Sequence, residues 1–202
     1  MEPKKTRKTL MLSNGDNLEV VIVAYQTTLL NDKFEMLHNC RQEKGSKFFI
    51  PVEEAEDAFR KWCKSSQPLF ASTTGGPVFD FLVVAPSNKN FAGILRNHAE
   101  INHQSDISQR FAKIDDASSA EPGTKLPDVF QSICYQSAGD EEEANSVAII
   151  DDVVSDGKTA AAIIQRLREA GLRKDAKIIV FCAHYRFGQS IAEAYRAMKR
   201  TV

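Results

Sequence analysis

The 202-residue sequence contains no apolar run that approaches the roughly 20 residues needed to span a bilayer. Its basic N-terminus is not followed by the apolar core of a signal peptide. The sequence also lacks an excess of either charge, because 26 Lys and Arg residues stand against 27 Asp and Glu residues. This balance provides no general drive toward nucleic acid or an anionic membrane. We therefore expect neither as a partner, and we expect Lys4, Lys5, Arg7 and Lys8 to belong to a solvated tail.

Cysteine is scarce and scattered. The four cysteines are Cys40, Cys63, Cys134 and Cys182, and none forms a Cys-x-x-Cys pair. Neither a zinc cluster nor a disulfide framework is indicated. Reduced thiols are typical of the cytosol, so we expect a cytoplasmic protein.

The most informative stretch that is present covers residues 147–159. Four apolar residues, Val-Ala-Ile-Ile, lead into Asp151 and Asp152, and a short turn with Gly157 precedes a helical pattern. The length and β-branched content of the apolar run predict a strand covered on both faces. Gly157 supplies the backbone freedom that a tight strand-to-helix turn requires.

This turn is chemically suited to an anion. Several backbone N–H groups and a helix N-terminus would point toward one place, which favours a phosphate. The two carboxylates suit paired hydroxyls or a divalent cation. The simpler alternative is that Asp151 and Asp152 are strand-end carboxylates that cap the next helix.

Residues 147–159 resemble the phosphoribosyl-diphosphate-binding loop of the type I phosphoribosyltransferase family. The resemblance implies that Asp151 and Asp152 hold the ribose hydroxyls and contribute to a Mg²⁺ site. It implies that the next loop binds the 5′-phosphate through Ser155, Asp156, Gly157, Lys158 and Thr159. Asp156 departs from the family, which usually has Ser or Thr there, and an ionised carboxylate repels phosphate.

The surrounding pattern predicts an α/β fold. Apolar strands at residues 79–85 and 178–183 alternate with helical patterns, which indicates a mostly parallel sheet with helices on both faces. Ligands of such sheets bind at the carboxyl ends of strands. The length fits a single domain, with residues 76–202 as its core. The Asn14-Gly15 pair predicts a β-hairpin, which we place in a small N-terminal hood formed from residues 1–75.

A second loop follows the strand at residues 79–85. The family resemblance implies that it binds the diphosphate through Ser87, Asn88, Lys89 and Asn90. Residues 106–128 are polar and irregular, and long loops in compact domains are often functional. In the family a flexible loop at this point closes over the reaction centre. Arg110 and Lys113 would then contact the leaving diphosphate, or else remain solvated charges.

Other features receive simpler interpretations. Trp62 lies on the apolar stripe of a helix over residues 52–63 and is expected in the core rather than as a base-stacking platform. We expect His98 and His103 at the surface, a short strand over residues 129–135, and an exposed turn at the acidic residues 140–143. A final helix over residues 191–198 and the strand before it are similar to the corresponding part of phosphoribosyl-diphosphate synthetases. Those enzymes have two such domains, however, and this chain has length for one.

These observations leave two main functions. One is a Mg²⁺-dependent phosphoribosyltransferase acting on a nucleobase or similar nitrogen acceptor, and family members are commonly dimers. The other is a regulatory protein of the same fold that binds phosphoribosyl diphosphate or a nucleotide without turnover. A hydrolase or partner-binding protein built on the same sheet is a third.

Overall fold

The computed structural model describes residues 3–12, 14–26, 50–71, 76–87, 89–114 and 125–185. Asn88 and the predicted C-terminal helix of residues 191–198 lie outside these ranges. Within them, no helix is long and apolar enough to cross a membrane.

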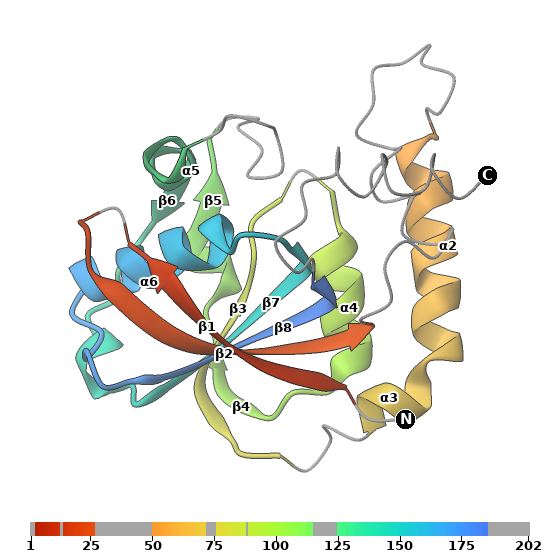
Figure 1. Ribbon diagram of the computed structural model, residues 1–202, viewed down its shortest axis with the longest axis horizontal. Coiled ribbons are helices and arrows are strands. Elements are labelled where there is room, and N and C mark those ends of the chain that lie inside the picture. Colours follow the sequence, from red (N-terminus) through yellow and green to blue (C-terminus); the bar gives the residue numbers. More distant parts are fainter. Residues whose placement is uncertain are drawn as a thin grey trace, which may run out of the picture.

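A six-stranded mixed sheet forms the centre of the fold, in the order β1-β2-β8-β7-β3-β4 (Figure 1). Its strands are β1 (Lys4–Met11), β2 (Asn17–Gln26), β3 (Phe79–Val84), β4 (His103–Asp106), β7 (Ser146–Val154) and β8 (Lys177–Tyr185). The strands from β2 to β4 in this order run parallel, whereas β1 is antiparallel to β2. The predicted α/β fold with a mostly parallel sheet is confirmed.

Helices cover both faces of this sheet. One face packs against α5 (Leu126–Ser132) and α6 (Lys158–Glu169), and the other against α2 (Val52–Ser65), α3 (Gln67–Ala71) and α4 (Phe91–Ala99). Ile149 of β7 belongs to the first cluster and Ile150 to the second, because successive strand side chains point to opposite faces. Trp62 of α2 is 6% exposed and stacks on Phe59, so its predicted core position is confirmed.

The predicted hairpin exists, but it is not a separate hood. β1 and β2 pair across a turn in which Gly15 has a φ of 88°. β2 then pairs parallel with β8, from Val21 opposite Ile179 to Gln26 opposite His184. The hairpin is therefore an edge of the main sheet. Lys4, Lys5 and Arg7 are exposed, as expected, but they and the half-buried Lys8 belong to β1 rather than to a tail.

The region expected to be one long loop contains short elements. The 3-10 helix η1 (Ser108–Arg110) leads into β5 (Phe111–Lys113), which pairs antiparallel with β6 (Ile133–Tyr135). Residues 126–132 are helical, so the predicted strand over residues 129–135 begins only at Ile133. Pro127 near the start of α5 and the Asp128 carboxylate, which accepts the Lys125 N–H at 2.9 Å, explain the helix. His98 and His103 are half-buried rather than fully at the surface.

Candidate functional site

The two predicted binding loops follow adjacent strands. β3 and β7 pair in parallel from Phe81 opposite Val147 to Val84 opposite Ile150. The chain leaves β3 toward β4 on one side and leaves β7 toward β8 on the other. This reversal is the topological switch point of the sheet, where ligands of open α/β sheets bind. The structure therefore brings the loop after Val84 and the loop after Val154 to the same edge.

The acidic pair lies within β7 rather than after it. The strand continues to Val154, with Asp151 opposite Cys182 and Val153 opposite His184. The regular alternation of side chains breaks here, because Ile150 and Val153 pack against the same cluster although two residues separate them. Such irregularities re-aim side chains near functional sites. The sequence pattern predicted a strand that ends in the two carboxylates, whereas pairing with β8 extends it to Val154.

The two carboxylates differ in their surroundings. Asp152 is 7% exposed, and Asp151 is half-buried and accepts the backbone N–H of Asp152 at 2.9 Å. The neighbouring Cys182 is fully buried, and burial, followed by the charge of Asp151, raises the pKa of its thiol well above the usual value. Cys182 is therefore a neutral thiol beside the acidic pair.

The turn after β7 supplies its own anion. Gly157 has a φ of 85° and caps α6. The carboxylate of Asp156 accepts the Lys158 backbone N–H at 3.3 Å and pairs with the Lys158 Nζ at 2.6 Å. One amide donor and the loop's cation thus already face a carboxylate, in the place where the sequence predicted a phosphate.

β1 packs against the same turn. Gly157 has a φ that favours glycine, and a Cβ added there would lie 2.5 Å from Leu10 Cδ2, so the Leu10 side chain would have to shift. The Lys8 Nζ donates to the Ser155 carbonyl at 2.9 Å and lies over the Tyr185 ring. Burial lowers the pKa of Lys8, while the charge of Asp156 opposes this shift.

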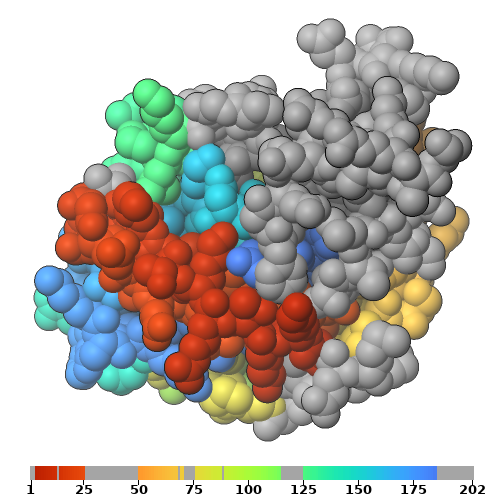
Figure 2. Space-filling view, viewed as in Figure 1, coloured from red at the N-terminus to blue at the C-terminus, as the bar shows by residue number. Residues whose placement is uncertain are grey.

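Figure 2 shows the hairpin in red on the molecular surface, beside α6 in blue. The sequence interpretation missed Lys8. The long apolar run in β2 was the available signal, because a long β2 implies a pairing strand β1 long enough to include Lys8.

The loop after β3 meets α2. The Lys89 N–H donates to the Ser87 Oγ at 3.3 Å, and the Asn90 N–H donates to the Glu56 Oε1 at 3.2 Å. Glu56 was not predicted, because no local pattern indicates that the second turn of α2 reaches this loop. As with Asp156 in the other loop, the Glu56 carboxylate here accepts a backbone N–H that was predicted to bind phosphate.

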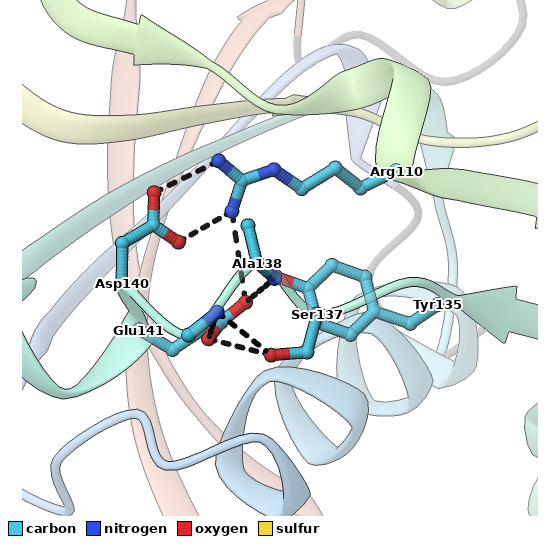
Figure 3. Close-up of polar contacts among 7 residues, drawn as sticks. Arg110, Tyr135, Ser137, Ala138, Asp140 and Glu141 are labelled. Carbon is cyan, nitrogen blue, oxygen red and sulfur yellow. Dashed lines mark hydrogen bonds and ion pairs between the residues drawn. The ribbon is translucent and has the colours of Figure 1, made fainter.

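Arg110 and Lys113 belong to the short elements η1 and β5. The Arg110 guanidinium packs over the Phe81 ring, which is level with Val147 and thus four residues, roughly 13 Å, from Asp151 along β7. It pairs with both carboxylate oxygens of Asp140, and Figure 3 shows it pointing at Asp140 and Glu141. Lys113 lies on β5, opposite Ile133. The structure thus gives Arg110 an internal carboxylate partner, set back along the sheet from Asp151.

The acidic run at residues 140–143 is not simply an exposed turn. It forms the 3-10 helix η2 (Glu141–Glu143), and Glu141 is 0% exposed. Its carboxylate accepts hydrogen bonds from the Tyr135 hydroxyl, the Ser137 hydroxyl and two backbone N–H groups. A run of like charges gave no sign that one of them is buried and hydrogen-bonded by the residues just before it in the chain.

The chain matches no protein-family model and no curated protein. Within the described ranges, no three His, Cys, Asp or Glu side chains gather in a way that would hold a metal ion.

Proposed function

We propose that the protein is a Mg²⁺-dependent phosphoribosyltransferase that transfers a 5-phosphoribosyl group from phosphoribosyl diphosphate to a nitrogen acceptor. The observation that carries the proposal is the pairing of β3 with β7 at the switch point. Two loops with phosphate-binding composition and an acidic pair meet there, as a phosphorylated sugar diphosphate requires.

Each group has a role in this proposal. The backbone of residues 155–159 binds the 5′-phosphate, and Asp151 and Asp152 bind the ribose hydroxyls. Lys89 and the amides of the loop after β3 face the diphosphate. The bond from ribose C1 to the diphosphate oxygen breaks, the diphosphate leaves with the bonding electrons, and the acceptor nitrogen bonds to C1 and loses its proton.

Mg²⁺ would neutralise the charge that develops on the diphosphate. Among the described residues at this edge of the sheet, Asp151 fits such an ion. Asp151 offers a half-buried carboxylate, and Mg²⁺ typically takes one or two carboxylates and completes its coordination with waters and substrate phosphates. The proposal places the activity in the cytoplasm, where thiols such as Cys63 and Cys182 stay reduced.

A second function is favoured by one specific observation. Asp156 pairs with Lys158 at the entrance to α6, so the protein's own carboxylate competes with the 5′-phosphate. A protein of this fold that binds phosphoribosyl diphosphate or a nucleotide without turnover accommodates this arrangement more easily than an efficient enzyme does.

Calorimetric titration of phosphoribosyl diphosphate with Mg²⁺, followed by a diphosphate-release assay over a panel of nitrogen bases, tests both functions. Binding with release supports the enzyme, and binding without release supports the regulatory protein. The Asp152→Asn variant is expected to bind about tenfold more weakly, equivalent to roughly 1.4 kcal/mol. The exposed Asp175→Asn variant serves as the control. Absence of binding by the wild-type protein would overturn both functions, and unchanged affinity in Asp152→Asn would remove the ribose role.

A further inference from the structure

The Glu56 carboxylate of α2 accepts two hydrogen bonds, one from the loop after β3 and one from its own helix. The Glu56 Oε1 accepts the Asn90 N–H at 3.2 Å, and the Glu56 Oε2 accepts from the Arg60 Nη2 at 3.1 Å. A backbone amide and a guanidinium thus converge on a single anionic group. This donor pair is the kind that binds phosphate oxygens in proteins, since a guanidinium recognises carboxylate and phosphate in the same way.

The position of this pair is fixed by packing. Phe59 of α2 contacts Phe91, the first residue of α4, with ring centroids 5.6 Å apart. Ala55 and Phe59 are buried on either side of Glu56 in the sequence, so the backbone of this turn is held against α4. The backbone at Arg60 is therefore held one turn after Glu56, whose carboxylate reaches Asn90 at the end of the loop after β3.

The side chains themselves are free to rearrange. The Arg60 side chain is 43% exposed, and it also pairs with Asp57, which is 68% exposed. Ion pairs between residues three or four apart on a helix surface are weak and are screened by salt. A diphosphate offers more charge and more acceptor oxygens than one carboxylate, so it can replace Glu56 as the partner of both donors.

We propose that Arg60 is a diphosphate-binding residue and that Glu56 is the internal anion which holds its donor site until ligand binds. This inference rests on the proposed function for the identity of the natural ligand. It assigns to Arg60 the part that the family resemblance implies for Arg110 and Lys113.

The test uses the full chain and two probes, inorganic diphosphate with Mg²⁺ and phosphoribosyl diphosphate with Mg²⁺. Arg60→Met is expected to weaken the binding of both by about tenfold or more, as for the loss of one charge-assisted hydrogen bond. Glu56→Gln is expected to strengthen the binding of both, because it removes the competing charge and keeps the side-chain shape. Lys61→Met is the matched control, since it removes the same charge from the next, exposed position of α2.

The outcomes separate this inference from the proposed function. Diphosphate binding that is strengthened in Glu56→Gln and weakened in Arg60→Met supports the inference, even if phosphoribosyl diphosphate does not bind. Equal effects of Arg60→Met and Lys61→Met would overturn it, because they would show only a general loss of positive charge. It is also overturned if Glu56→Gln binds no diphosphate while its circular dichroism and melting temperature match the wild type.

Discussion

Arg110 and Asp140 form a two-pronged ion pair, with the two guanidinium nitrogens 2.5 and 2.8 Å from the two carboxylate oxygens. The same guanidinium lies 3.6 Å from the buried carboxylate of Glu141. It thereby links η1 to η2, two segments thirty residues apart in the chain. This arrangement gives Arg110 a structural role at a distance from the switch point.

The first prediction concerns the stability of Arg110→Met. Removing Arg110 leaves the buried carboxylate of Glu141 and the partly exposed carboxylate of Asp140 without their cation, and we expect a loss of about 1–3 kcal/mol in the free energy of unfolding. Urea denaturation measures this loss. Arg173→Met, which removes an exposed pair with Asp175, is the control and should leave the free energy of unfolding unchanged. Unchanged stability of Arg110→Met together with lost diphosphate binding would instead support the ligand role.

The comparison of Arg110 with Lys158 shows which parts of the site were predictable from the sequence. Lys158 follows a buried strand and a glycine turn, so local pattern alone indicated its place at the start of α6. Arg110 lies in a polar stretch with no periodicity, and its position depends on partners thirty residues away. Strand β7, helix α6 and the meeting of two loops at one edge follow from local pattern and the rules of parallel sheets.

Long-range pairing accounts for the rest. The length of β1 depends on its register with β2, and the length of β7 on its register with β8. Hydrophobic runs in the sequence do not specify either register. Glu56 reaches the loop after β3 only because α2 packs on α4. The burial of Glu141 similarly depends on Tyr135 and Arg110. The local sequence around Glu56 and around Glu141 resembles an ordinary solvated helix face or turn, so neither contact was predictable from it.

The second prediction is a loss of stability in acid that depends on Glu141. Burial raises the pKa of Glu141, but the hydrogen bonds from Tyr135, Ser137 and backbone N–H groups outweigh it and hold the pKa below the usual 4.5. Hydrogen bonding to Arg110 likewise lowers the pKa of Asp140 below 3.8. The unfolded chain therefore binds protons at higher pH than the folded protein does. The stabilisation is complete above the usual pKa and is lost as the pH falls through the lowered values.

Urea denaturation at a series of pH values from 7 to 3 checks this expectation. Tyr135→Phe removes one donor to Glu141 and should make the decline in acid shallower, while lowering stability at pH 7 by about 1–2 kcal/mol. An acid dependence identical to that of the wild type would show that the hydrogen bond from Tyr135 does not set the pKa of Glu141.

The third prediction tests the contact between β1 and the turn after β7. Gly157→Ala places a Cβ 2.5 Å from Leu10 and also forces alanine to a φ of 85°. Gly15→Ala has a similar φ of 88° with nothing within 4 Å of the added Cβ, so it measures the cost of the backbone conformation alone. We expect Gly15→Ala to cost about 1 kcal/mol and Gly157→Ala about 1–3 kcal/mol more. Equal losses in thermal or urea denaturation would show that Leu10 moves aside freely.

The fourth prediction concerns Asp156, whose carboxylate faces both the amide and the ammonium group of Lys158. In Asp156→Ser the hydroxyl can still accept the Lys158 N–H, so the turn should keep its shape. The negative charge that competes with a phosphate is lost, and Lys158 is released to bind it. We therefore expect the affinity for phosphoribosyl diphosphate with Mg²⁺ to rise about tenfold, which calorimetric titration measures.

The diphosphate-release assay on Asp156→Ser then distinguishes the two proposed functions. Turnover that appears in the variant and is absent from the wild type would show that Asp156 alone separates a binding protein from an enzyme. Tighter binding without turnover would favour a regulatory protein. The exposed Asp175→Ser variant, which removes the same charge far from the switch point in sequence and leaves this turn intact, should behave as the wild type. Weaker binding in Asp156→Ser would show that the carboxylate belongs to the ligand site, because its loss would then remove a contact instead of a competitor.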